Sequence, residues 1–214
     1  MRTAALLIFV AACADGASGD VDYDHVAQLL GTSIATPEAG GETGALADAA
    51  IIARGGLPVG FENEHGIVVG LHDGTRYVYM VVCEDTAGAS TPCSPVAARA
   101  FAIAEWSSPQ QKRTGIWTLE HLQGAVASVT GGSSFTHTDE GLDMADDRNE
   151  AFLLDLGSYE PRSGTIATDL AIDDTKLSGT IQMTTSRIAM LTLPGHVYQI
   201  DLDTGEVVPG QILR

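Results

Sequence analysis

The chain has 214 residues and a formal net charge of −17, because 28 Asp and Glu outnumber 11 Lys and Arg. Nucleic-acid binding depends mainly on clustered basic side chains that neutralise phosphates, whereas the basic residues here are scattered and Lys112-Arg113 is their only adjacent pair. Composition therefore excludes a nucleic-acid-binding protein, and the same negative charge would repel an anionic lipid surface. The length is that of one domain with a sizeable core.

The chain begins with one basic side chain, Arg2, followed by an apolar run of nine residues, 4–12, that ends at a cysteine. A membrane-crossing helix needs about 20 apolar residues, whereas the apolar core of a secretory signal has about 7–15. The last four residues of this segment, Val10-Ala11-Ala12-Cys13, resemble the lipobox of a bacterial lipoprotein signal peptide. That resemblance implies cleavage before Cys13 and acylation of its thiol, palmitate included.

The resemblance divides the chain into a signal peptide (1–12), a flexible tether (13–24) and a single β-rich domain (25–214). The tether is small, polar and acidic, as expected of a flexible linker, and several acyl chains would anchor it stably to a membrane. Ala14 follows Cys13, where an Asp retains lipoproteins in the inner membrane of some bacteria, so the resemblance implies the outer membrane. The alternative is an ordinary signal peptide cleaved near Ala14 or Ala17, which would make the protein secreted.

Two short helices are expected next. Val26, Leu29 and Leu30 follow helical spacing within residues 22–30, and Gly31 is positioned to end that helix with a left-handed cap. A second helix is expected over residues 43–54, with Thr43 as its N-terminal cap and two glycines after its last residue.

From residue 66 onward the hydrophobic period changes from helical to two, which is typical of antiparallel strands with one buried and one wet face. Residues 77–82 are apolar on both sides, which predicts a central strand. Glycine-containing turns follow at His72-Asp73-Gly74-Thr75 and Asp203-Thr204-Gly205. The predicted strands are 66–71, 76–83, 97–106, 115–121, 125–130, 134–138, 151–156, 164–172, 177–187, 188–193 and 196–202.

These elements predict a mainly β fold with one or two short N-terminal helices. The strands would form a meandering antiparallel sheet, and three arrangements remain open for it: a sandwich, a barrel or a strongly curved sheet.

Setting Cys13 aside leaves one pair of cysteines, Cys83 and Cys93, on either side of a turn-rich segment. Oxidising compartments outside the cytoplasm favour disulfides. The sequence therefore predicts a Cys83–Cys93 disulfide, with two unpaired thiols or a metal-binding pair as the alternatives.

The acidic stretch 139–150 contains four aspartates, Asp139, Asp143, Asp146 and Asp147, that are candidate calcium ligands. Calcium takes about six to eight oxygen ligands, but the spacing matches no EF-hand loop, so a solvated loop between strands is the favoured interpretation. The histidines lack the spacing of a zinc-binding helix. We therefore expect no metal and no cofactor.

Asp203-Thr204-Gly205 has the same three residues as the active-site triplet of pepsin-like and retroviral-type aspartic proteases. That family requires a small residue after the glycine and a second triplet, whereas Glu206 follows here and the triplet occurs once. A hairpin turn explains the three residues completely.

Apart from its leader, the chain resembles acidic, β-rich lipoproteins of Gram-negative bacteria whose activities are poorly described. The leading hypothesis is a non-enzymatic envelope lipoprotein, structural or binding a protein or an apolar ligand. A second hypothesis is a carrier whose curved sheet encloses an apolar ligand, which requires an apolar cavity of at least about 300 Å³. A third is a hydrolase with paired carboxylates in the acidic stretch or near Asp203, which requires converging carboxylates and at least one raised pKa.

Overall fold

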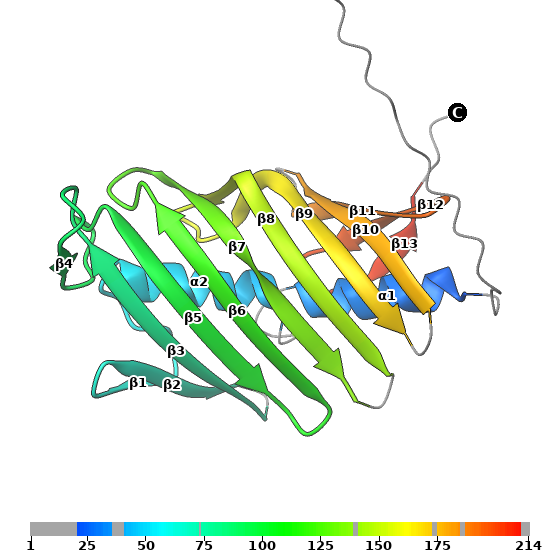
Figure 1. Ribbon diagram of the computed structural model, residues 1–214, viewed down its shortest axis with the longest axis horizontal. Coiled ribbons are helices and arrows are strands. Elements are labelled where there is room, and N and C mark those ends of the chain that lie inside the picture. Colours follow the sequence, from blue (N-terminus) through cyan, green and yellow to red (C-terminus); the bar gives the residue numbers. More distant parts are fainter. Residues whose placement is uncertain are drawn as a thin grey trace, which may run out of the picture.

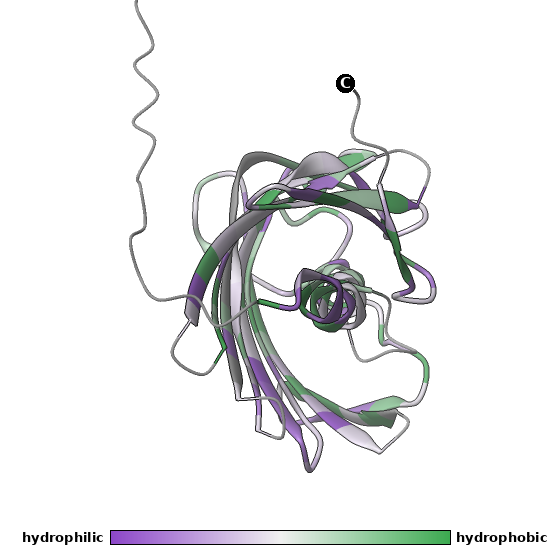
Figure 2. Cartoon of the chain, turned by 90° about the vertical axis from the view of Figure 1, so that its right-hand side faces the viewer, coloured by the Kyte–Doolittle hydropathy of each residue, from purple (hydrophilic) through white to green (hydrophobic). Residues whose placement is uncertain are grey.

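The computed structural model describes residues 21–35, 41–72, 74–138, 141–172, 175–184 and 187–210. In these residues, one antiparallel sheet curls around two helices that lie end to end along its inner face (Figures 1 and 2). The predicted mainly β fold with short N-terminal helices is therefore confirmed. Of the three arrangements left open, the sheet adopts the strongly curved one. Cys13 and the tether up to residue 20 lie outside the described residues.

Every neighbouring pair of strands is antiparallel, and the strands follow chain order across the sheet except that the two-residue β4 pairs with β3 outside the main path. The strands are β1 (Phe61–Glu64), β2 (Ile67–His72), β3 (Thr75–Glu84), β4 (Ser90–Thr91), β5 (Arg99–Ser107), β6 (Gln111–Glu120), β7 (Val126–His137), β8 (Leu142–Asp155), β9 (Pro161–Ile172), β10 (Thr175–Met183), β11 (Ile188–Leu193), β12 (His196–Asp201) and β13 (Val207–Pro209).

The first helix, α1 (Tyr23–Ile34), is longer than predicted, because Gly31 lies inside it instead of ending it. A Cβ atom on Gly31 would lie 2.3 Å from Cγ2 of Val207 and 2.7 Å from the carbonyl oxygen of Gly205. Glycine is therefore required here for close approach of the β12–β13 hairpin, and the predicted cap is wrong.

The second helix, α2 (Glu42–Ala53), is capped by Gly41, so the prediction of Thr43 as its cap is also wrong. Thr43 instead lies in the first turn and its hydroxyl donates to the carbonyl oxygen of Ile34, at 2.8 Å, linking the two helices. Most residues of α2 are buried on all sides. This explains why its sequence is rich in alanine and shows little amphipathic contrast.

The acidic stretch is the largest difference from the predicted strands. Residues 139–150 were expected to form a loop, but β8 begins at Leu142 and pairs with both β7 and β9. Backbone hydrogen bonding to two long neighbours outweighs the low strand propensity of Asp and Asn. The two strands predicted at 125–130 and 134–138 are likewise one strand, β7, with a register shift between Val129 and Gly131.

Both predicted turns connect adjacent strands. His72 pairs with Thr75 across the β2–β3 connection, where Gly74 has φ +80° and Asp73 lies outside the described residues. In the turn after β12, the Asp201 carboxylate accepts backbone N–H groups of Asp203 and Thr204, at 2.8 and 3.1 Å. The triplet that matches aspartic proteases is therefore a turn stabilised by a neighbouring aspartate.

Candidate binding surface

The outer face of the sheet, the face turned away from the helices, is apolar over β2, β3, β5 and β6. A single exposed hydrophobic side chain is ordinary, but a contiguous patch of them marks an interaction site. Among the described residues, eleven large hydrophobic side chains are exposed, and seven of them lie on this face of these four strands. We call them, together with half-buried Val69 and Val78, the outer apolar patch. The seven are Ile67, Leu71, Met80, Val82, Phe101, Ile103 and Ile116.

Strand register aligns the patch into a continuous row. Ile67 pairs with Met80, Met80 with Ile103, and Ile103 with Ile116. Directly opposed residues have Cβ atoms about 4.5–5.5 Å apart, so these four side chains contact one another across the sheet. The next position on β7 is Gly132, which ends the row and leaves Ile116 60% exposed.

The patch residues point away from α2, which packs against the inner face of β3 and β5. Along β5 the buried positions include the small Ala100, Ala102 and Ala104, while Phe101 and Ile103 point outward. Small side chains suit the inner face because α2, itself alanine-rich, contacts β3 and β5. Residues 77–82 lie in β3, which pairs with β2 on one side and β5 on the other, as predicted for a central strand. The outer face of β3 is nevertheless exposed.

The same sheet carries a polar outer face elsewhere. On β9 and β10 the exposed positions include Asp169, Lys176, Ser178, Thr180 and Gln182, and the Ser178 hydroxyl donates to the Asp169 carboxylate at 2.7 Å. The apolar character of β2–β6 is therefore a local feature of one part of the sheet.

Charged side chains border the patch at both ends of its strands. Arg76 and Lys112 are exposed at one end, in the outer row that also contains Leu71. At the other end, the Arg99 guanidinium binds the Glu84 carboxylate at 2.5 Å and lies over the ring of Phe101, which belongs to the patch. Exposed Glu105 lies between Lys112 and the central row and adds an acidic charge.

Next to the patch, β7–β10 form a hollow of about 570 Å³. Its lining includes exposed Ser134, Asp169 and Lys176, above the buried Phe135 and Leu170. The lining also includes the apolar Met144, Ala171 and Leu177, so polar and apolar side chains contribute to it together. The volume exceeds the minimum of about 300 Å³ expected of a carrier, but the lining is not the apolar one that the carrier hypothesis requires. The helices lie inside the curl of the sheet (Figure 2).

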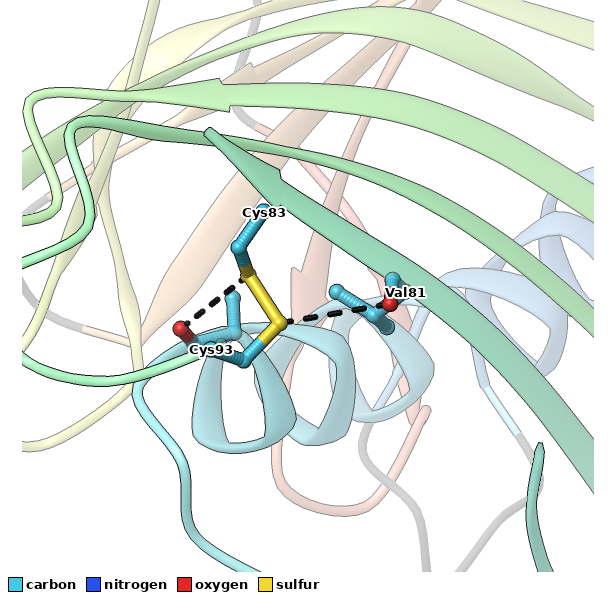
Figure 3. The surroundings of a disulfide bond; sticks show 4 residues. Val81, Cys83 and Cys93 are labelled. Carbon is cyan, nitrogen blue, oxygen red and sulfur yellow. Dashed lines mark hydrogen bonds between the residues drawn. A yellow bond between two sulfur atoms is a disulfide. The ribbon is translucent and has the colours of Figure 1, made fainter. Parts of the chain in front are cut away.

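The predicted pairing of Cys83 with Cys93 is present, with an S–S distance of 2.09 Å and 5.2 Å between the Cα atoms. Figure 3 shows the bond joining Cys83, near the end of β3, to Cys93 in the segment after β4, with α2 beside it. The Cys83 sulfur lies 3.5 Å from the carbonyl oxygen of Ala53, the last residue of that helix. The disulfide therefore fixes the loop beyond β3 against α2, beside the patch residue Val82.

Of the four calcium candidates, only Asp143 has a side chain that the structure describes. Asp143 is exposed on β8, Asp139 lies outside the described residues, and the side chains of Asp146 and Asp147 are not described. Among the described residues, no group of three or more His, Cys, Asp or Glu is arranged to hold a metal ion.

The carboxylate proposed for hydrolysis, Asp203, faces a cation. Arg187 donates to Asp203 at 3.0 Å and also to Glu160, and all three side chains are exposed. Exposed ion pairs contribute little to stability, about 0–1 kcal/mol. The Arg187 guanidinium lies between the carboxylates of Asp203 and Glu160 and binds both. This arrangement differs from the hydrolase hypothesis, which requires two carboxylates that converge in a cleft.

Two tyrosine–aspartate hydrogen bonds attach the helices to the sheet. The Tyr79 hydroxyl, on β3, donates to Asp48 of α2 at 3.0 Å, and Tyr198, on β12, donates to Asp24 of α1 at 2.8 Å. Burial, and then the adjacent carboxylate, raise the pKa of Tyr79 well above its usual value and that of Tyr198 to about 12.

A buried ion pair secures the junction between the helices. Arg113 on β6 and Glu42 at the start of α2 are 2% and 0% exposed, with 3.7 Å between Nη1 and the carboxylate. The guanidinium also donates to the carbonyl oxygen of Ser33 and lies 5.5 and 4.7 Å from the ring centroids of Trp106 and Phe135. This pair is enclosed in the core, and we assign it a structural role.

The sequence contained signals for the patch that were not used. Residues 77–82 are apolar on both sides, and small and large apolar residues alternate along 100–104. Either pattern could have indicated a strand that is apolar on its exposed face as well as its buried one.

Comparison with protein-family models, curated proteins and solved structures finds no match to this chain. Within the described ranges, neither helix is long and apolar enough to cross a membrane.

Proposed function

We propose that this protein is a membrane-anchored envelope lipoprotein with a non-enzymatic binding role. Cys13, after the lipobox-like Val10-Ala11-Ala12, would carry the acyl chains, and residues 14–20 would connect them to the domain, whose first helix begins at Tyr23. The outer membrane remains our proposal for its location, because Ala14 follows Cys13.

The observation that carries the binding role is the outer apolar patch. The patch has nine outward positions, three each on β2 and β3, two on β5 and one on β6. With strand spacings of about 4.8 Å and a rise of about 3.4 Å per residue, these positions cover about 300 Å². The largest patch on a typical monomer is about 300–600 Å² and is often functional. The polar outer face of β9–β10 supports the same view, because a sheet with no ligand for its outer face would not need one apolar sector.

Intact mass spectrometry of the native protein, extracted from membranes with and without reductant, tests the anchor. We expect a chain that begins at Cys13 and carries acyl mass, and that gains the mass of a reduced disulfide on treatment. An unmodified chain that begins after Cys13 would make the protein secreted and would overturn the proposal.

A further inference from the structure

We propose that the outer apolar patch rests on the lipid bilayer that holds the acyl anchor, so that the sheet lies with β2–β6 against the headgroup region. This inference rests on the proposed function, since it requires the domain to be tethered at a membrane. Apolar surface that lies in the interface is stabilised by the area it removes from water. Three features of the protein point to a lipid surface as the occupant.

The first feature is size. A stable protein interface buries about 800 Å² on each partner, more than twice the area of the patch, which strand spacing puts at about 300 Å². A second copy of the chain would also bring together two proteins of formal charge −17. The patch is therefore too small and the chain too acidic for self-association to be the better explanation, whereas a bilayer sets no minimum area.

The second feature is the distribution of basic residues at the edge of the patch. Arg76 and Lys112 are both exposed in the outer row that borders it, in a chain with few basic residues. Long basic side chains lay their stems along apolar surface and place their charges among lipid headgroups. Exposed carboxylates also border the patch: Glu62 and Glu64 on β1 pair with Val69 and Ile67, and Glu105 and Glu120 lie on β5 and β6. Because these carboxylates and the net charge oppose anionic lipids, the geometry favours a leaflet rich in zwitterionic lipid.

The third feature is the length of chain between the anchor and the domain. Eight peptide links join Cys13 to Val21, the first described residue, and they span at most about 29 Å. Val21 precedes α1, which contacts β12 and β13, whereas the patch strands lie over α2, farther along the pair of helices (Figure 1). The tether keeps this end of the domain within about 29 Å of the anchor and is long enough to span the helix diameter of about 10–12 Å between α1 and the sheet.

The test uses the acylated, full mature protein in phosphatidylcholine vesicles, with an environment-sensitive fluorophore on a single introduced thiol. The Phe101→Cys variant places the probe in the patch, and the matched control, Thr180→Cys, places it at an exposed position on the outer face of β10. The native pair, Cys83 and Cys93, is bonded and does not react. The probe at position 101 should shift to shorter wavelength and lose most of its quenching by iodide, while the probe at position 180 stays in water.

A second variant separates docking from the effect of the probe. Met80→Thr and Ile103→Thr, introduced together with the Phe101→Cys probe, replace patch residues by a side chain that suits exposed strands and should reverse much of the shift. Adding anionic lipid to the vesicles should weaken the shift. Circular dichroism verifies that the variants are folded.

Equal exposure of the two probes on vesicles, for a protein whose mass shows the acyl group, would overturn docking and leave the anchor intact. A shielded probe at position 101 in vesicle-free solution, together with a dimer mass, would assign the patch to a second copy and would also overturn it. If the mass shows no acyl group, the proposed function fails, and docking fails with it.

Discussion

Removing the buried Arg113 should destabilise the domain more than any surface substitution. Arg113→Met keeps an unbranched apolar stem but removes the guanidinium, whose Nη1 lies 3.7 Å from the carboxylate of the fully buried Glu42. Removing one partner of a buried ion pair costs about 3–5 kcal/mol. The free energy of unfolding of a typical domain is about 5–15 kcal/mol, so this loss would be at least about a fifth of the total.

Urea unfolding followed by circular dichroism measures this loss. With a slope of about 2–3 kcal/mol per molar urea for a domain of this size, the midpoint should fall by about 1–2 M. The control is the double variant Arg113→Met with Glu42→Leu, which removes both charges and should recover most of the loss, because a well-packed apolar pair can replace a buried ion pair at little cost. A midpoint unchanged in the single variant, or equally low in the double variant, would refute the reasoning.

Three further predictions follow from contacts elsewhere in the fold. Gly31→Ala should cost about 1–3 kcal/mol by overpacking α1 against the β12–β13 hairpin, and a melting temperature equal to that of the native protein would contradict this. Absorbance titration should show the Tyr198 hydroxyl ionising near pH 12, and Tyr198→Phe should remove that step. Because the folded pKa exceeds the unfolded one, stabilisation by the Tyr198–Asp24 hydrogen bond should be complete below about pH 10 and be lost as the pH rises through 12; tyrosine ionisation at the ordinary pKa in the folded protein would argue against it. Replacing both Cys83 and Cys93 by serine should lower the free energy of unfolding by about 2–3 kcal/mol, and a urea midpoint that is the same with and without reductant in the native protein would show that the bond contributes little.

Features determined by neighbouring residues could be predicted from the sequence. The period of two identified most strands, the turns after β2 and β12 followed from glycines at positive φ, and the Cys83–Cys93 pair followed from its short, turn-rich loop. Where prediction was wrong, a distant element had intervened. Gly31 serves the hairpin that contains Val207 and does not end its own helix, and the acidic stretch forms β8 because β7 and β9 pair with its backbone on both sides.

The candidate surface depended on the tertiary structure for a similar reason. Alternation along β5 shows that Phe101 and Ile103 share one face and Ala102 the other, but not which face is buried. A mainly β chain with two helices and a disulfide could be predicted from the sequence, because pattern and turn chemistry act over a few residues. The orientation of β5, with Phe101 and Ile103 facing solvent, came from the packing of α2 against its other face, where Ala100, Ala102 and Ala104 are buried.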